Sequence, residues 1–409
     1  MTVAPDAVPD PVPAAVEANT VAGGGISRRL TLVLAVAGGL TAANLYYAQP
    51  LLHTIGKEFG TSEGTTGLLV TASQVGYALG LAFVVPIGDF VDRRKLTTLL
   101  LGLVTVVMAG AAVAPGLWIM VGLVGLAGLG SVTAQVLVPL AAGLATDGDR
   151  GRVVSTVMTG LLLGILLART VSGIVAGLAG WRVMFAIAAA VAVGLAVVLR
   201  RELPSDPARP AVAYGSLLAS VLRLLRAQRE LRRSALLGAL GFATFSVFWT
   251  TIAFHLSEAP FDYGDGAIGL LGLAGAAGAV CALAAGRLAD RGLAKPSRIG
   301  AAAAVAASFG ILWAGRTSIL VIVLGVLLLD VGVQGIQVLN QTVIYELAPE
   351  ARSRINSAYM TCYFAGGALG SAIGAAAYEA GGWARVCQLG ALLGLLAVAT
   401  TLPGARRRS

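Results

Sequence analysis

The segment Gly88-Asp89-Phe90-Val91-Asp92-Arg93-Arg94-Lys95 lies between two apolar stretches, residues 65–87 and 96–114. A helix of about 20 apolar residues crosses the hydrocarbon core of a bilayer. Each stretch can therefore form a membrane-spanning helix, and the charged segment is the short loop between them. A second segment, Gly286-Arg287-Leu288-Ala289-Asp290-Arg291-Gly292, repeats the pattern of glycine, three residues, aspartate and arginine. This repetition predicts two related halves.

The composition extends this interpretation to the whole chain. Of the 409 residues, 57% are hydrophobic and 12% are charged, whereas an ordinary soluble domain has roughly 25% charged residues. A water-soluble fold is therefore excluded. Lipid offers no hydrogen bonds to the backbone, so spanning segments are helices or a closed barrel. The apolar stretches lack the period-two alternation of strands, and we expect an all-α membrane protein.

We expect twelve transmembrane helices in two pseudo-symmetric six-helix bundles. They are predicted near residues 30–52, 65–87, 96–114, 118–144, 153–179, 182–200, 234–256, 267–286, 298–315, 318–345, 355–379 and 383–403. The predicted domains are a disordered cytoplasmic tail (1–27), an N-terminal bundle (28–200), a cytoplasmic linker (201–233), a C-terminal bundle (234–403) and a basic cytoplasmic tail (404–409).

The distribution of basic residues predicts the orientation. Most Lys and Arg residues fall on the side of the predicted helices that carries both termini, and the opposite side holds only Lys57, Arg182, Arg316 and Arg385. Because cytoplasmic loops carry an excess of positive charge, we expect both termini in the cytoplasm and the protein in the cell's inner membrane. The basic stretch 223–233 either lies on anionic lipid headgroups or is a solvated linker. We expect no nucleic-acid partner, since these charges form short clusters between apolar segments.

The two halves also resemble each other at a shift of 202 residues. The matches pair His53 with His255, Phe59 with Phe261, Gly64 with Gly266, Gln135 with Gln337, Met158-Thr159 with Met360-Thr361, and Trp181 with Trp383. Matches along the whole of each half indicate parallel repeats, with the solute site between them.

Twelve helices, the internal repeat and the paired loops together resemble the major facilitator superfamily. The matching loop residues are Gly88, Asp92, Arg93, Gly286, Asp290 and Arg291. The resemblance implies alternating access, with Asp92 and Asp290 latching the cytoplasmic side in the outward-facing state. The first copy departs from the family pattern, because it lacks the glycine that follows Asp-Arg.

The predicted helix 153–179 carries two candidate features. Its glycines at 164, 173 and 177 resemble part of the superfamily's antiporter motif, although glycines at this spacing also serve ordinary helix packing. The same helix contains Arg169 among apolar residues. A charge inside the membrane is costly unless it is paired or hydrated, so Arg169 is a functional candidate, with a structural arginine bound to backbone carbonyls as the alternative.

The predicted helix 318–345 contains the second intramembrane charge, Asp330. It is followed at steps of four, three and four residues by Gln334, Gln337 and Gln341, which places the four side chains on one helical face. Burial disfavours an ionised carboxylate, as a proton-coupling site requires, and we expect Asp330 and Arg169 to act in proton coupling. A structural pair between these two residues is the alternative.

The remaining candidates for the solute path are polar or aromatic residues in other helices. They are Asn44, Tyr47, Gln49, Gln135, Trp249 and Thr251. The stretch Asn-Leu-Tyr-Tyr-Ala-Gln-Pro-Leu-Leu at 44–52 resembles superfamily members grouped with drug and metabolite exporters. Aromatic walls with a few amides suit an amphiphilic organic solute. Membrane-interface anchoring is the alternative role of such aromatic residues, and it suits Trp181 and Trp383 better than Tyr47 or Trp249.

No phosphate-binding loop ending in Gly-Lys-Ser or Gly-Lys-Thr occurs in the sequence, so an ion gradient or the gradient of the solute itself must supply the energy. We expect a monomeric, proton-coupled exporter of a small amphiphilic molecule, with no catalytic residues, cofactor or metal. Its partners are then a small-molecule substrate, protons and the lipid bilayer. The alternatives are an uptake symporter or facilitator and a non-transporting membrane sensor.

Overall fold

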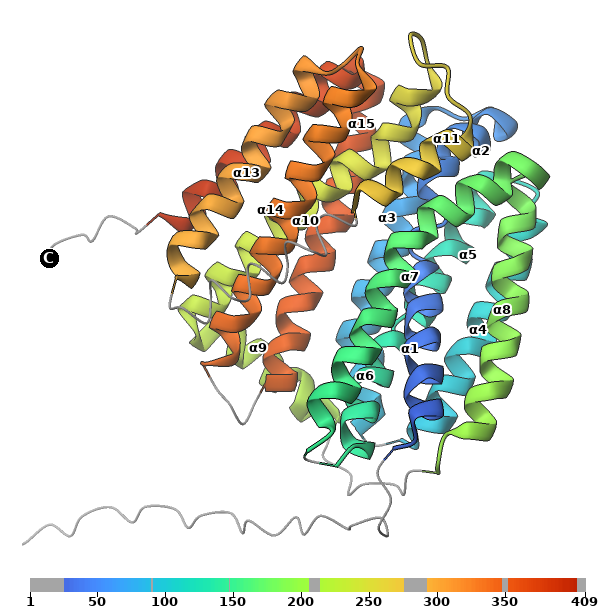
Figure 1. Cartoon of the computed structure of the whole chain (residues 1–409), viewed down its shortest axis with the longest axis vertical. Coiled ribbons are helices and arrows are strands. Elements are labelled where there is room, and N and C mark those ends of the chain that lie inside the picture. The colour runs from blue at the N-terminus through green and yellow to red at the C-terminus, as the bar shows by residue number, and fades with distance from the viewer. Residues whose placement is uncertain are drawn as a thin grey trace, which may run out of the picture.

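The computed structural model describes residues 26–89, 91–146, 148–205, 214–275, 293–347 and 352–402. In these ranges the chain forms helices joined by turns and contains no β-strand (Figure 1). Nine of the described helices are long and apolar enough to cross a membrane. The prediction of an all-α membrane protein is thus confirmed.

The N-terminal half begins at Arg28. Its elements are α1 (Arg28–Ala43), η1 (Gln49–Leu51), α2 (Leu52–Phe59), α3 (Glu63–Leu79), η2 (Gly80–Val84), η3 (Val85–Asp89), α4 (Arg93–Ala112), α5 (Leu117–Gly130), α6 (Thr133–Leu144), α7 (Arg150–Ala179) and α8 (Trp181–Glu202). The first helix starts where the Ser27 hydroxyl accepts the N–H of Leu30. It ends before an irregular segment, residues 44–48, which is followed by Pro50 in η1. Proline has no N–H to continue a helix.

The C-terminal half follows α9 (Tyr214–Ala227). Its elements are α10 (Arg229–Ser257), α11 (Asp265–Leu270), η4 (Leu271–Gly275), α13 (Ala294–Ala314), α14 (Ile319–Tyr345) and α15 (Arg352–Thr401). The last of these is interrupted at Gly381 and Gly382, where φ of Gly382 is 60°, a conformation that favours glycine. The two helices predicted at 355–379 and 383–403 therefore meet at this break. The predicted helix 267–286 is described as far as Gly275.

The outer surface of the bundle is apolar. Large aliphatic side chains point away from the protein, among them Leu99, Val113 and Leu178, of which Leu178 is 84% exposed. Soluble monomers rarely expose extended apolar surface. This surface is suited to contact with lipid acyl chains.

Equivalent residues of the two halves have similar surroundings. Trp181 packs its ring against Phe59 and donates its indole N–H to Glu58, at 2.5 Å. In the other half, Trp383 stacks on His255 and donates to the carbonyl of Leu312, at 3.1 Å. Both tryptophans are buried against protein, so they fix the ends of helices within each half. The alternative role of anchoring at the lipid-facing surface is not seen for either residue.

One end of the molecule, where α2 and α11 meet, is called the Asp265 end; it lies at the top of Figure 1. There α7 runs along α11, and α3 with η2 runs along α15 from this end as far as the hydrogen bond from the Ser357 hydroxyl to the carbonyl of Leu81, at 3.3 Å. Hydrogen bonds link the halves from Thr54 to Asp265 at 2.7 Å, Ser62 to Glu379 at 3.1 Å, Thr71 to Ser371 at 2.9 Å, and Gln74 to Ser246 at 3.1 Å. The opposite end, at which α1 begins, is called the Arg28 end.

The glycines of α7 bring backbones into contact. A Cβ on Gly164 would overlap the backbone of Gly39 in α1, and a Cβ on Gly173 would overlap α11. One set of glycines thus packs α7 within its own half, and the other packs it across the boundary between the halves. This close packing accounts for the glycine spacing.

Candidate functional site

Arg169 of α7 lies buried between the two halves, with 3% of its surface exposed. Its Nε donates to Oε1 of Gln49 in η1, at 2.6 Å. The guanidinium carbon lies 4.0 Å from the ring centroid of Trp249 in α10. The rings of Tyr46 and Phe245 lie within 4.7 Å and 5.3 Å of the same atom. Three aromatic faces therefore stabilise this cation.

Asp330 of α14 lies in the same region and is 4% exposed. It interacts electrostatically with Arg169, but the two side chains form no ion pair within 4.0 Å. The indole N–H of Trp249 lies near the carboxyl without completing a hydrogen bond of normal geometry. The structure therefore does not contain the direct Asp330–Arg169 ion pair that was the alternative explanation for both residues.

Several polar atoms around this pair are buried without a hydrogen-bond partner among the described residues. They are Gln49 Nε2, Arg169 Nη2, Trp249 Nε1, Thr250 Oγ1 and Asp330 Oδ1. A buried polar group without a partner costs about 1–3 kcal/mol. Such groups cluster where a ligand, an ion or water completes the bonding.

A small cavity opens at this cluster. Its volume is about 10 Å³, and it is lined by Gln49, Pro50, Arg169, Trp249, Ile252 and Ile268. That is room for roughly one water molecule. The lining comes from both halves and combines a cation, an amide, an indole and aliphatic side chains. A solute larger than water requires the halves to separate here.

The glutamines predicted to share a face with Asp330 extend from it along α14. All three are partly buried. Gln337 accepts a hydrogen bond from Tyr363 at 3.3 Å, and Gln341 donates to Asn356 at 3.5 Å. These contacts join α14 to α15, and Gln334 takes no part in them.

Among the predicted path residues, Gln49 and Trp249 line this cavity, and the others make different contacts. Asn44 is half-buried beyond the end of α1. The main-chain carbonyl of Tyr47 accepts the Ser172 hydroxyl, at 2.6 Å. Gln135 donates to the Tyr77 hydroxyl at 3.1 Å, and Thr251 bonds to the carbonyl of Val247 in its own helix, at 2.7 Å.

The predicted cytoplasmic gate is described in its first copy alone. Asp92 caps α4, where Oδ1 accepts the N–H of Arg94 at 2.9 Å, and Arg93 donates to the carbonyl of Gly88 at 3.1 Å. In this structure the motif thus shapes its own loop. Gly286, Asp290 and Arg291 lie outside the described residues.

Two aromatic residues at the site, Tyr46 and Phe245, are not among the predicted path residues. Tyr46 belongs to the stretch 44–52, of which the neighbouring Tyr47 is the predicted path residue. Phe245 lies four residues before Trp249, a spacing that puts both rings on one helical face. This spacing is the signal that sequence reasoning could have used.

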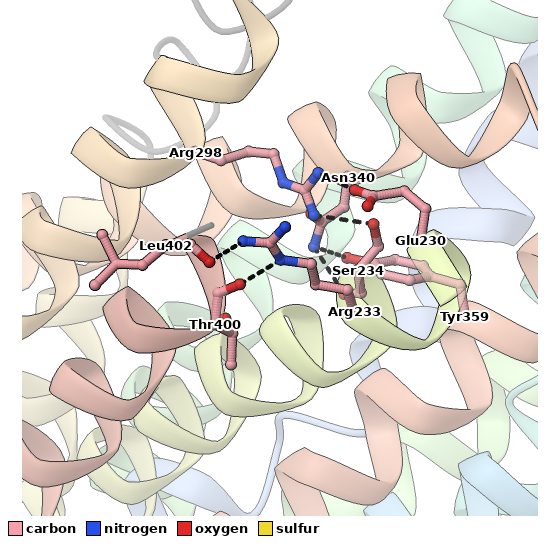
Figure 2. A network of polar contacts seen from close by, with 8 residues as sticks. All are labelled: Glu230, Arg233, Ser234, Arg298, Asn340, Tyr359, Thr400 and Leu402. Carbon is pink, nitrogen blue, oxygen red and sulfur yellow. Dashed lines mark hydrogen bonds and ion pairs between the residues drawn. The ribbon is translucent and has the colours of Figure 1, made fainter. Parts of the chain in front are cut away.

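A second buried arginine, Arg298 of α13, was also missed. It is 5% exposed and donates to Glu230 at 2.8 Å and to Ser234 at 2.9 Å (Figure 2). Asn340 donates to the carbonyl of Ser234 and to the Tyr359 hydroxyl in the same network. All these groups belong to the C-terminal half, so the network holds that half together.

A larger cavity of about 350 Å³ lies beside this network. It is lined by Arg229, Arg232, Arg233, Leu236, Thr400 and Leu402. Arg233 donates to the carbonyls of Thr400 and Leu402, which close the end of α15 (Figure 2). This cavity lies at the edge of one half, away from the boundary between the halves, and we assign no solute to it.

No cluster of three or more His, Cys, Asp or Glu residues with metal-binding geometry occurs within the described ranges. Cys362 and Cys387 are free thiols. Cys281 lies outside these ranges.

Comparison with known proteins shows a family match and related sequences. The family model of the Major Facilitator Superfamily matches residues 34–371. The chain is 46% identical over 371 residues to the transporter YgaY of Escherichia coli (strain K12), covering 91% of this chain and 94% of that one. It is 34% identical over 387 residues to the transporter SCO4007 of Streptomyces coelicolor, covering 93% and 89%.

Solved structures share the fold at low sequence identity. A mutant of the nucleoside transporter NupG superposes with a TM-score of 0.76 at 13% identity, covering 91% of this chain and 98% of that one. The D-xylose-proton symporter superposes with a TM-score of 0.70 at 18% identity, covering 92% and 98%. The family match spans most of the chain and includes Arg169 and Asp330. The chain belongs to the Major Facilitator Superfamily and is a multi-pass membrane transporter, not an enzyme.

Proposed function

We propose that the protein is a proton-coupled secondary transporter of a small amphiphilic organic molecule and that Asp330 is its proton site. The supporting observation is that Asp330 and Arg169 are both buried between the halves without a direct ion pair. A carboxyl that is not locked to a cation can gain and lose a proton as its surroundings change. Arg169 is then its electrostatic partner.

We further propose alternating access by two bundles, residues 28–200 and 234–403, joined by the linker 201–233. In this proposal the Arg28 end and both termini face the cytoplasm, and the membrane is the inner one. The hydrogen bonds at the Asp265 end then close the path on the outside, and this structure represents an outward-closed arrangement. The latch by Asp92 and Asp290 belongs to the opposite state.

Two directions of transport are candidates. The stretch 44–52 favours export in exchange for protons, because it resembles drug and metabolite exporters. The unpartnered Nη2 of Arg169 favours uptake together with protons. An anion bound to this group and a proton on Asp330 favour the same state of the site, so the two cross the membrane together. The glycines of α7 do not decide between the two, since they are used in packing.

Purified protein in liposomes tests the proposal. A panel of amphiphilic solutes is screened for charge movement on a solid-supported membrane, with and without an imposed pH gradient. Asp330→Asn is expected to remove the response to the gradient, and Asp149→Asn, which changes a surface carboxylate, is the matched control. Transport that ignores the gradient, or a gradient response retained in Asp330→Asn, contradicts proton coupling at this residue.

A further inference from the structure

The unpartnered atoms that border the central cavity are mainly hydrogen-bond donors. Arg169 Nη2, Gln49 Nε2 and Trp249 Nε1 are N–H groups, and all three are buried without a partner among the described residues. The orientation of the Gln49 amide is set by Arg169, because its Oε1 accepts from Arg169 Nε at 2.6 Å. Its NH₂ group is therefore left to donate. The cavity lining therefore presents unpartnered donors, and the unpartnered acceptor Asp330 Oδ1 belongs to a residue outside that lining.

The charge around the cavity has the same sign. Arg169 lines the cavity, and no carboxylate does among the described residues. Asp330 lies close enough to affect Arg169 electrostatically, yet beyond 4.0 Å. When Asp330 carries a proton, the site has a positive charge without a counter-charge. Uncompensated charge in an apolar interior is costly, and an anion removes this cost.

We propose that the transported molecule carries a carboxylate or a similar planar oxyanion, which binds the N–H groups of Arg169 and Gln49. Two N–H donors from adjacent side chains match the two oxygens of a carboxylate, which is an acceptor only. Ile252, Ile268 and the face of Trp249 receive the apolar part of the molecule. An organic cation meets Arg169 at the same place and is repelled.

This inference rests on the proposed function and adds a consequence for coupling. An ionised Asp330 offsets the charge of Arg169 and competes with the anion. A protonated Asp330 leaves Arg169 free to bind it. The anion and the proton thus favour the same state of the site, and both cross the membrane in the same direction. Among the two candidates above, the geometry selects co-transport with protons.

Binding to purified full-length protein tests the inference. The probes are benzoate, benzamide and benzylamine, with hexanoate, hexanamide and hexylamine as an aliphatic series, and the readout is the shift in melting temperature with concentration. Carboxylates are expected to stabilise the protein, and the amides and amines are not. Stabilisation by an amide or amine equal to that by its carboxylate, or no stabilisation by either carboxylate, overturns the inference.

Variants locate the binding group. Arg169→Gln is expected to lose the carboxylate shift, and Arg169→Lys to retain part of it. The matched control is Arg316→Gln, which removes an arginine on the exposed face of another tryptophan, 5.2 Å from the Trp313 ring centroid. A full carboxylate shift in Arg169→Gln overturns the inference.

A measurement on the wild-type chain avoids the risk that a variant misfolds. Benzoate binding in weakly buffered solution at neutral pH is expected to take up about one proton per bound molecule, and Asp330→Asn to bind benzoate without proton uptake. Release of a proton, or no exchange in the wild-type chain, overturns the coupled binding. Carboxylate binding with transport that ignores a pH gradient leaves the substrate class standing and defeats proton coupling. Proton-driven transport of an amide or amine leaves proton coupling standing and overturns the proposed substrate class.

Discussion

The guanidinium of Arg169, from the N-terminal half, stacks on the indole of Trp249, from the C-terminal half, at 4.0 Å. A cation–π contact of this kind is worth about 0.5–2 kcal/mol. It is formed across the boundary that has to open during transport, so its loss affects both binding and the balance between states.

We expect Trp249→Leu to weaken benzoate binding about 2- to 30-fold, because the cation–π contact is lost and Arg169 loses its support. Trp249→Phe keeps an aromatic face and removes the N–H near Asp330. We therefore expect a smaller loss of benzoate affinity in Trp249→Phe than in Trp249→Leu. Isothermal titration with each variant measures the effect. Wild-type affinity in Trp249→Leu contradicts a role for the indole.

The contact between Thr71 and Ser371 predicts a reversible lock. Their hydroxyl oxygens lie 2.9 Å apart across the two halves. With Cys281, Cys362 and Cys387 replaced by serine, Thr71→Cys combined with Ser371→Cys is expected to form a disulfide on oxidation and to stop transport, which returns after reduction. Each single substitution is the control. Continued transport by the cross-linked protein means that the Asp265 end does not open during the cycle.

Asp265 predicts a pH dependence of this closure. Asp265 precedes the apolar part of α11, and burial raises the pKa of its carboxyl, against the opposing effects of the Thr54 hydrogen bond and of nearby His53. In an open state the exposed carboxyl has an ordinary pKa near 4. A proton then binds the closed state more tightly, so closure is favoured as the pH falls toward about 4 and loses this advantage as the pH rises through the raised pKa.

Spin-label distances measure this closure in the cysteine-free background, between exposed positions in opposite halves, Lys57→Cys and Ala380→Cys. The closed population is expected to increase at low pH, and Asp265→Asn is expected to remove that increase. A pair within one half, Lys57→Cys and Ala179→Cys, is the control. An unchanged pH response in Asp265→Asn assigns the effect to another group.

Close packing of α7 on α1 predicts a difference between two glycines. Gly164→Ala forces a Cβ into the backbone of Gly39, whereas Gly122→Ala adds one where no atom lies within 4 Å. We expect the first to destabilise the protein by about 1–3 kcal/mol and the second to have little effect. Thermal unfolding in detergent measures both. Equal stability of the two variants contradicts the packing.

The Arg298 network predicts a larger effect than an exposed ion pair. Arg298→Gln leaves Glu230 and Ser234 without a buried partner, and breaking a buried pair costs about 3–5 kcal/mol. Glu230 is partly exposed, so we expect a loss near or below the lower limit of that range. The control is Arg29→Gln, since the exposed pair of Arg29 with Glu202 is worth about 1 kcal/mol or less. Similar losses in the two variants contradict a structural role for the network.

The sequence predicted the fold class, the apolar segments and both central charges. Arg169 and Asp330 were recognised because a charge inside an apolar run is costly unless it has a role. Their relationship could not be predicted, since it depends on how three helices and η1 approach one another. Trp249 and Gln49 were likewise found as single residues, and the stacking and the amide orientation followed only from the structure.

Arg298 was missed for a different reason. It lies at the start of the predicted helix 298–315, next to a basic loop, where an arginine is ordinarily solvated. Its burial results from Glu230 and Ser234 of α10, which are more than 60 residues away in the chain. A charge at a helix end carries no local signal that distinguishes these cases.

The bonds that join the halves at the Asp265 end come from hydroxyl, carboxylate and amide groups. Water can replace each of them when the halves part, so little hydrogen-bond energy is lost on opening. The two arrangements can therefore remain close in free energy, so that a single proton, worth about 1.4 kcal/mol per pH unit, is enough to reverse their populations.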